Sequence, residues 1–416
     1  MKKQLSVWVR KPGFASFLAS VFSIIIGLVF GFILLIIFNP SKSLPGMERM
    51  LFAGIGSTEK LAKVLYQAAP LIMTGLAVGF AFKTGLFNIG ASGQYLTGAF
   101  FALYTGMIWQ FPWWAALLAA MVGGAVWGAM PGLFKAFFNV NEVITSIMFN
   151  WIGLFAVNLA LANTPQVLAD YYGASNTDRT ANLEAANVSA IIPKWGLDSL
   201  FGSTYMNISI FIAILIALII YVVLNKTTFG YELKACGLNR NASIYAGINA
   251  RRNIILSMVI AGGLAGIGGG IYYLSGTAQY TIDKMLLPMG FNGIPVALLA
   301  ISNPAATIFS ALFVSYIQVG GDAMQPEYAK EIIDIIISVI IYLSAFALVV
   351  KGLVRKLIDR NSKNHRKTSP ADFESSTDSE SASDSEPTAT TDDSEPTATA
   401  DDSEPTATAD VVEVVE

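Results

Sequence analysis

The chain has very little of the side-chain chemistry on which most catalytic and metal sites depend. Its 416 residues include one cysteine, Cys236, and one histidine, His365, which lies in a basic stretch near the carboxyl end. One cysteine excludes an intrachain disulfide. The sequence also offers no Cys/His metal site and no histidine-based triad or proton relay within its hydrophobic segments. We therefore expect neither a metal site nor an enzyme.

Charged residues are also scarce, at 13% of the chain against 54% hydrophobic residues. Soluble domains contain about 25% charged residues, so this is the composition of a membrane protein. The charge is unevenly distributed, because no Lys or Arg follows Lys367 whereas 15 of the 29 acidic residues do. Residues 1–367 carry 26 basic and 14 acidic groups, a net charge of +12, and are followed by an acidic tail.

The tail repeats the unit DSEPTATxD, which places Glu386, Glu395 and Glu404 nine residues apart. A polar, acidic segment punctuated by proline cannot bury enough apolar surface to fold. We expect residues 351–416 to form a cytoplasmic tail that is disordered from about residue 368.

Long apolar stretches predict an all-α, polytopic membrane domain over residues 14–350. A run of about 20 apolar residues is long enough to cross a bilayer as a helix. About ten spans are expected, at 14–38, 61–82, 86–109, 113–134, 142–162, 206–224, 254–275, 287–301, 306–320 and 331–350. The spans 287–301 and 306–320 are short and separated by Asn303-Pro304, so either two full spans or a broken, re-entrant pair fits the pattern.

The distribution of Lys and Arg predicts the orientation of the spans. With a cytoplasmic amino terminus (residues 1–13), the cytoplasmic segments hold 18 of the 26 basic residues, in agreement with the positive-inside rule. An even number of spans then leaves both termini in the cytoplasm. Two longer excursions are expected: an external loop at 163–205 and a cytoplasmic loop at 225–253, with five basic residues and one acid.

The stretch GLFNIGAS at 85–92 has the glycine spacing of a phosphate-binding loop, but Ala91 stands where that motif has lysine. Hydrophobic spans also flank it on both sides, so we interpret it as a packing surface. Small residues let helices approach closely in membranes. The glycines expected to pack in this way are Gly85, Gly90, Gly93 and Gly98.

Neutral amides are the polar groups that the spans place at membrane depth. Unpaired polar groups are costly there, so each amide either bonds a neighbouring helix or lines a polar pathway. The candidates for a translocation pathway are Asn88, Gln94, Asn150, Asn158 and Asn292, with Gln67 and Gln318 as additions. Glu142 is better explained by a favourable position in the first turn of its helix. Because no ionisable group was found at a span centre, we expect the energy source to lie outside this chain.

The cytoplasmic loop predicts two short helices, one over 231–237 stopped at Gly237 and one over 241–246 stopped at Gly247. Between basic flanks, such helices are either a docking element or an ordinary solvated loop.

Five blocks in fixed order resemble the permeases of ABC importers for branched-chain amino acids, simple sugars and nucleosides. They are GLFNIGASGQYLTGAF, NEVITSIMFNWIG, GYELKACGLNRNASIYAGI, AGGLAGIGGG and GFNGIPVALLAISNP, and the resemblance covers about residues 15–350. The second block and the long external loop look most like the nucleoside-uptake branch. Two departures are Ser92, where relatives commonly have an acid, and Pro295, which we expect to kink its helix.

The resemblance implies a multi-pass permease subunit in the cytoplasmic membrane of a bacterium. Its implied partners are a second, shorter permease, a cytoplasmic ATPase that carries ATP and Mg, an external lipoprotein or periplasmic binding protein, and membrane lipid, but no nucleic acid. No cofactor is implied for this chain itself. Coupling to the ATPase is implied for the cytoplasmic loop, at Glu232, Leu233, Lys234, Ala235, Gly237, Asn239, Ala242, Ala246 and Gly247.

The sequence thus predicts a nucleoside-import permease, with two alternatives left open. One keeps the architecture and imports a monosaccharide or a branched-chain amino acid. The other is a self-sufficient secondary carrier or channel, which would transport without an ATPase.

Overall fold

The computed structural model describes residues 12–345 except residues 176 and 326. They all belong to the first of two units, Met1–Asn361 and Ser362–Glu416. The tail at 351–416 with its repeat, the end of the tenth expected span and all but two residues of the amino-terminal segment 1–13 lie outside the described residues.

The described part of the chain is helical and contains no β-strand, only isolated bridges that join Leu168 to Thr180 and Arg179 to Thr281. Its α-helices are α2 (Pro12–Phe38), α3 (Ser43–Phe52), α4 (Thr58–Lys83), α5 (Ala91–Met107), α6 (Trp113–Phe138), α7 (Glu142–Ala162), α8 (Leu183–Ala186), α9 (Leu197–Phe201), α10 (Ser209–Lys226), α11 (Thr228–Leu238), α12 (Arg240–Tyr245), α13 (Ala250–Tyr273), α14 (Pro288–Phe291), α15 (Gly293–Leu299), α16 (Pro304–Asp322) and α17 (Lys330–Ala345). Short 3₁₀ turns join several of them, at Pro40–Lys42, Ala53–Ile55, Pro165–Val167, Ala169–Tyr172 and Val188–Ala190.

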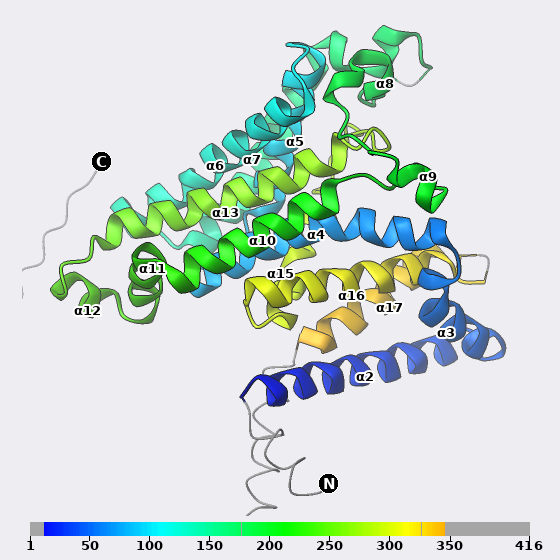
Figure 1. Ribbon diagram of the computed structural model, residues 1–416, viewed down its shortest axis with the longest axis horizontal. Coiled ribbons are helices and arrows are strands. Elements are labelled where there is room, and N and C mark those ends of the chain that lie inside the picture. The colour runs from blue at the N-terminus through cyan, green and yellow to red at the C-terminus, as the bar shows by residue number, and fades with distance from the viewer. Residues whose placement is uncertain (1–11, 176, 326, 346–416) are drawn as a thin grey trace, which may run out of the picture. The chain divides into compact units, whose positions relative to one another are not determined.

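Six of these helices, α4, α6, α7, α10, α13 and α16, are long and apolar enough to cross a membrane. Shorter apolar helical stretches lie at Ile24–Phe38 and Pro288–Leu299. The prediction of an all-helical, polytopic protein is therefore confirmed. In Figure 1, α11 and α12 lie at one end of the helix bundle, and α3, α8 and α9 lie toward the other.

Three expected elements differ from the structure. The span expected to begin at residue 86 begins as a helix only at Ala91, because Gly85 has a φ of +76° and opens a turn. The span expected at 287–301 is interrupted at Asn292, between α14 and α15. The neighbouring span, expected to be short, is instead the 19-residue helix α16, which Asn303 caps by accepting the Ala305 N–H at 3.1 Å.

Small residues bring the central helices together. A Cβ on Gly128 of α6 would lie 2.5 Å from the Met258 carbonyl oxygen and 2.8 Å from the Gly262 Cα of α13. In a bilayer, such close backbone approach replaces the hydrophobic driving force that water supplies to soluble proteins. Most of the α4 and α13 surface is buried as a result, which makes these helices the core of the bundle.

Ion pairs lie at the helix ends rather than along the apolar helices. Arg49–Glu327 (2.8 Å) and Lys63–Asp322 (3.1 Å) join segments near the amino terminus of α4. Lys135–Glu142 (3.0 Å) and Arg252–Glu232 (3.1 Å) join segments near the carboxyl terminus of α6 and the amino terminus of α13. The bundle therefore has two polar ends with an apolar middle, as a protein that spans a bilayer requires.

Candidate functional site

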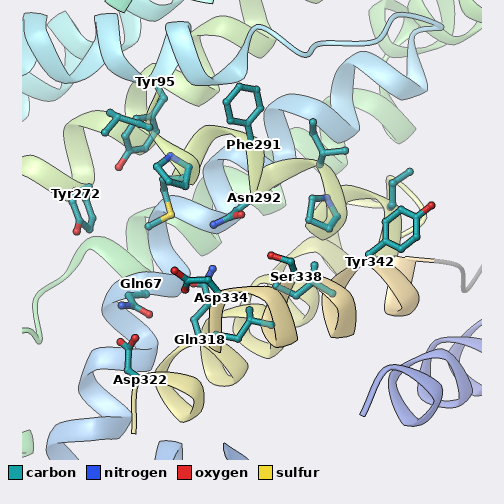
Figure 2. Close-up of a pocket in the computed structure, with 18 of the residues that line it drawn as sticks. Gln67, Tyr95, Tyr272, Phe291, Asn292, Gln318, Asp322, Asp334, Ser338 and Tyr342 are labelled. Atoms are coloured by element: carbon teal, nitrogen blue, oxygen red, sulfur yellow. The ribbon is translucent and has the colours of Figure 1, made fainter. Parts of the chain in front are cut away.

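A cavity of about 1150 Å³ lies between α4, α5, α13, the interrupted segment α14–α15, α16 and α17. Figure 2 shows Tyr95 and Phe291 on one side of it, with Gln67, Gln318, Asp322 and Asp334 on the opposite side. A volume of this size accommodates a small organic molecule with room to spare.

Two polar atoms on the cavity wall have no hydrogen-bond partner among the described residues. They are the hydroxyl of Tyr95, a side chain only 1% exposed, and the Oε1 atom of Gln67. Buried polar groups are nearly always paired, because burying them without a partner loses their bonds to water. Both atoms are themselves buried, so they are unpaired polar groups within the wall and not on the open surface of the cavity.

Aromatic rings form much of the remaining wall. Tyr272 stacks on Tyr66, with ring centroids 5.5 Å apart and planes at 30°, and the adjacent Tyr273 packs edge-on against it. The Tyr66 hydroxyl is bonded to Ser275 at 3.2 Å, which fixes the stack. One end of the cavity is therefore lined by tyrosine rings whose positions are fixed by packing against one another.

Charged groups also line the cavity, which the sequence interpretation did not anticipate. Asp322 is paired with Lys63, whereas Lys330 and Asp334, one turn apart on α17, have no ion-pair partner within 4 Å among the described residues. These charged groups lie at the end of α16 and in the first turns of α17, so they do not contradict the expectation that the span centres hold no ionisable group. Asp334 escaped notice because it lies only four residues inside the start of α17.

Three of the amides that the sequence offers as pathway candidates line the cavity, namely Asn292, Gln67 and Gln318. Asn292 lies between α14 and α15 and keeps right-handed helical dihedral angles, with φ −62° and ψ −17°. Pro295 is the third residue of α15, in the first turn after the interruption, where a proline removes no N–H bond from the helix interior.

The other amides bind neighbouring segments instead. Asn88 and Gln94 form a reciprocal pair, with Nδ2–Oε1 at 2.8 Å and Nε2–Oδ1 at 3.1 Å, and both are at most 1% exposed. Asn150 of α7 accepts the Gly93 N–H at 2.8 Å and donates to the Ile89 carbonyl at 3.1 Å. Asn150 thus holds the 86–93 turn against α7, the Asn88–Gln94 pair joins the turn to the start of α5, and none of the three residues lines the cavity.

Asn158 also has a structural position. Its amide donates to the Asp283 carbonyl at 2.7 Å and accepts from the Tyr280 hydroxyl at 2.7 Å, which ties α7 to the segment before α14. Burial, with a smaller contribution from the Asp283 carboxylate, raises the pKa of Tyr280 to about 12. The hydroxyl is therefore protonated at neutral pH and able to donate.

The loop at 225–253, which the sequence predicts to be cytoplasmic, contains α11 and α12. The first helix was expected to stop at Gly237, but α11 continues to Leu238. Asn239 then caps α12 by accepting the Ala242 N–H at 3.0 Å. The second expected stop is present, since Gly247 follows α12 with a φ of +81°.

The implied coupling residues differ in exposure along this segment. Leu233 is buried, and Glu232, which pairs with Arg252, is half-buried together with Lys234 and Ala235. The remaining implied residues, Gly237, Asn239, Ala242, Ala246 and Gly247, are exposed. Between them lie two apolar side chains that the sequence interpretation missed, Leu238 at 88% exposed and Tyr245 at 93% exposed.

Glycine contacts connect α11 to the cavity wall. A Cβ on Gly237 would lie 2.6 Å from the Thr84 carbonyl carbon and 2.7 Å from the Gly85 nitrogen, so α11 packs directly on the α4–α5 turn. At the far side of that turn, the Ser92 hydroxyl donates to the Leu287 carbonyl at 2.9 Å, next to α14. The other predicted packing glycines contact other segments. Gly93 lies against the backbone of α7, Gly98 lies against the backbone of α13, and Gly90 lies beside the Asn88–Gln94 pair.

Comparison with known proteins places this geometry in context. Residues 60–345 match the family described as branched-chain amino acid transport system / permease component. The chain is 36% identical over 349 residues to the nucleoside ABC transporter permease protein NupB of Lactococcus lactis subsp. cremoris (strain MG1363), which covers 82% of this chain and 93% of NupB. It is 34% identical over 347 residues to the guanosine ABC transporter permease protein NupP of Bacillus subtilis (strain 168), covering 82% and 96%.

A third relative is the glucose ABC transporter permease protein TsgB13 of Haloferax volcanii, 30% identical over 299 residues, covering 69% of this chain and 77% of TsgB13. No solved structure matches the chain significantly.

Proposed function

The chain belongs to the family of permease components of branched-chain amino acid transport systems, and on that premise we propose that it imports nucleosides as one subunit of an ATP-driven transporter. The observation that carries this proposal is its similarity to two nucleoside permeases over more than nine-tenths of their length. The chain is a multi-pass protein of the cytoplasmic membrane and is not itself an enzyme.

The proposed topology has ten membrane segments with both termini in the cytoplasm. The segments are α2, α4, α5, α6, α7, α10, α13, the interrupted pair α14–α15, α16 and α17. Cytoplasmic placement of α11 and α12 is supported by the basic residues around them and by the positive-inside rule. A reporter enzyme fused after Val350 tests this, since activity outside the cell would contradict it.

Docking of the ATPase is proposed on α11 and α12. Leu238, Ile244 and Tyr245 leave three large apolar side chains exposed on this short segment, and exposed apolar patches of this kind mark protein interfaces. ATP and Mg would be bound by that partner, and none of the described residues form a cluster that could hold a metal ion.

Two further partners are proposed, a second, shorter permease beside this chain and an external substrate-binding protein. The external loop at 163–205 is ordered by its own 3₁₀ turns and by backbone bonds to the segment after α13, such as Thr180 N–H to the Tyr280 carbonyl at 2.8 Å. A loop held this firmly presents a defined surface to a delivery protein.

The test is uptake of labelled uridine and guanosine in cells with and without this chain, in a strain without another nucleoside importer. Uptake should require the chain and a functional ATPase partner. Transport of the nucleosides in vesicles that contain this chain alone would support the self-sufficient carrier instead. Glucose and ribose serve as competitors because of the similarity to TsgB13, and leucine tests the branched-chain amino acid alternative. If only a sugar competes with the labelled nucleoside for uptake, the monosaccharide alternative is favoured.

A further inference from the structure

We propose that a small basic pocket, at the end of the bundle where α11 and α12 lie (Figure 1), binds the phosphate group of an anionic membrane lipid. The pocket is formed where α6, the α4–α5 turn, α11, α12 and α13 meet. Its volume of about 200 Å³ exceeds several times the roughly 30 Å³ that a water molecule occupies in the liquid, so a phosphate group fits. Lipid binding here rests on the proposed topology, which places this end at the cytoplasmic face, and does not depend on the cargo.

Two cationic side chains from different helices line this pocket. Lys135 is in the last turn of α6, and Arg240 is the first residue of α12. None of the described residues on the pocket wall carries a carboxyl group. The nearby carboxylates of Glu142 and Glu232 lie off the wall and are paired, with Lys135 at 3.0 Å and with Arg252 at 3.1 Å. The charge of the wall therefore favours an anion.

The guanidinium of Arg240 has the bonding capacity that a phosphate group needs. It has no carboxylate within 4 Å among the described residues, and it donates to the Asn139 Oδ1 atom only across a long 3.5 Å. A guanidinium carries five N–H donors in a planar fork that matches two phosphate oxygens. Lys135, although paired with Glu142, has three donors and can add one to the same anion. A phosphate between Lys135 and Arg240 would thus join the end of α6 to α12.

The apolar surface beside the pocket favours a lipid over a free phosphate ion. Phe134, Phe137 and Phe138 surround Lys135 in the sequence of α6 and are 40%, 59% and 73% exposed. Phe138 lies three residues after Lys135 and so on the same side of the helix. In a bilayer, acyl chains would cover these rings while the headgroup reaches the two cations, as is typical of basic pockets between membrane helices on the cytoplasmic side. A free phosphate ion would leave the rings uncovered.

Cys236 is the only cysteine of the chain and lines the pocket, so its reactivity reports whether the pocket is occupied. The full-length chain is placed in nanodiscs of phosphatidylcholine, with or without phosphatidylglycerol, and the rate of labelling by the uncharged reagent N-ethylmaleimide is measured. Phosphatidylglycerol should slow labelling at least fivefold, whereas millimolar inorganic phosphate in phosphatidylcholine discs should not.

Two variants and two controls locate the effect. Arg240→Gln should abolish the protection, and Arg240→Lys, which keeps the charge, should retain part of it. Lys226→Gln removes an exposed basic residue outside the pocket and should leave the protection unchanged. In a Cys236→Ser background, Thr228→Cys places a thiol at the exposed start of α11, outside the pocket, where labelling should not depend on the lipid.

A second measurement uses the complete importer with its ATPase and partner permease. Native mass spectrometry should show phosphatidylglycerol bound to this chain with at least fivefold higher occupancy than in Arg240→Gln. Equal protection of Cys236 by inorganic phosphate would assign the pocket to the free ion and overturn the lipid. Protection that persists in Arg240→Gln, or that neither lipid nor phosphate provides, would overturn the site. These outcomes do not involve nucleoside uptake, so the proposed function stands or falls separately.

Discussion

Gly85 and Gly237 are in backbone contact: a Cβ on Gly85 would lie 2.5 Å from the Cα of Gly237. Gly85 opens the turn between α4 and α5, and Gly237 is in the last turn of α11. The hydroxyls of Thr84 and Ser257 bond to each other and hold the same turn to α13. A displacement of α11 therefore pushes directly on the turn that leads into the cavity wall.

Replacing Gly85 or Gly237 with alanine should uncouple ATP hydrolysis from transport. A methyl group at either position would have to separate two backbones that touch, so we expect uptake to fall at least tenfold while membrane insertion and ATP hydrolysis by the assembled complex persist. The measurement is uptake per ATP hydrolysed in reconstituted vesicles.

Gly202→Ala is the matched control for this prediction. Gly202 shares the positive φ of Gly85, at +60°, but has open space where its Cβ would be. It therefore reproduces the backbone strain of about 1 kcal/mol without the contact. An equal loss of uptake in Gly202→Ala and Gly85→Ala would show that strain, and not the contact with α11, is responsible.

The apolar side chain of Leu238 should be needed to hold the ATPase. Leu238→Asp places a charge where an interface would bury it, and we expect at least a tenfold loss of ATPase that copurifies with the chain. Leu200→Asp is the control, because Leu200 is 74% exposed on α9, at the end of the bundle away from α11 and α12 (Figure 1). Full retention of the ATPase in Leu238→Asp would place the docking surface elsewhere.

Periodicity and length predicted most of the helices, because a membrane span must be long, apolar and bounded by polar turns. They did not predict the cavity. Tyr95 and Tyr272 look like ordinary apolar span residues in sequence, and they line one cavity with Asn292 only because the fold brings α5, α13 and the α14–α15 segment together. The amides at 88, 94 and 150 were equally ambiguous, since only the three-dimensional contacts show that each amide is bonded to protein groups.

The Asn88–Gln94 pair should contribute to stability and not to recognition of the cargo. Asn88→Leu leaves the Gln94 amide buried without its partner, which costs about 1–3 kcal/mol. We expect a lower thermal unfolding temperature with the KM for uridine unchanged. The double variant Asn88→Leu with Gln94→Leu removes both partners and should recover part of the loss. A raised KM in Asn88→Leu would instead return this residue to the translocation pathway.

The Tyr280–Asn158 bond predicts a specific alkaline sensitivity. Burial and the nearby Asp283 raise the pKa of Tyr280 from 10.0 to about 12, so the folded protein favours the protonated hydroxyl. A group whose folded pKa is raised contributes stability that is complete below pH 10 and is lost as the pH rises toward 12. Tyr280→Phe lacks both the bond and the ionisation, so we expect it to unfold more readily than the unmodified chain at pH 8, with the difference shrinking between pH 10 and 12. Thermal unfolding of the purified complex across this range measures the effect, and a difference that stays constant with pH would show that Tyr280 does not lose its proton there.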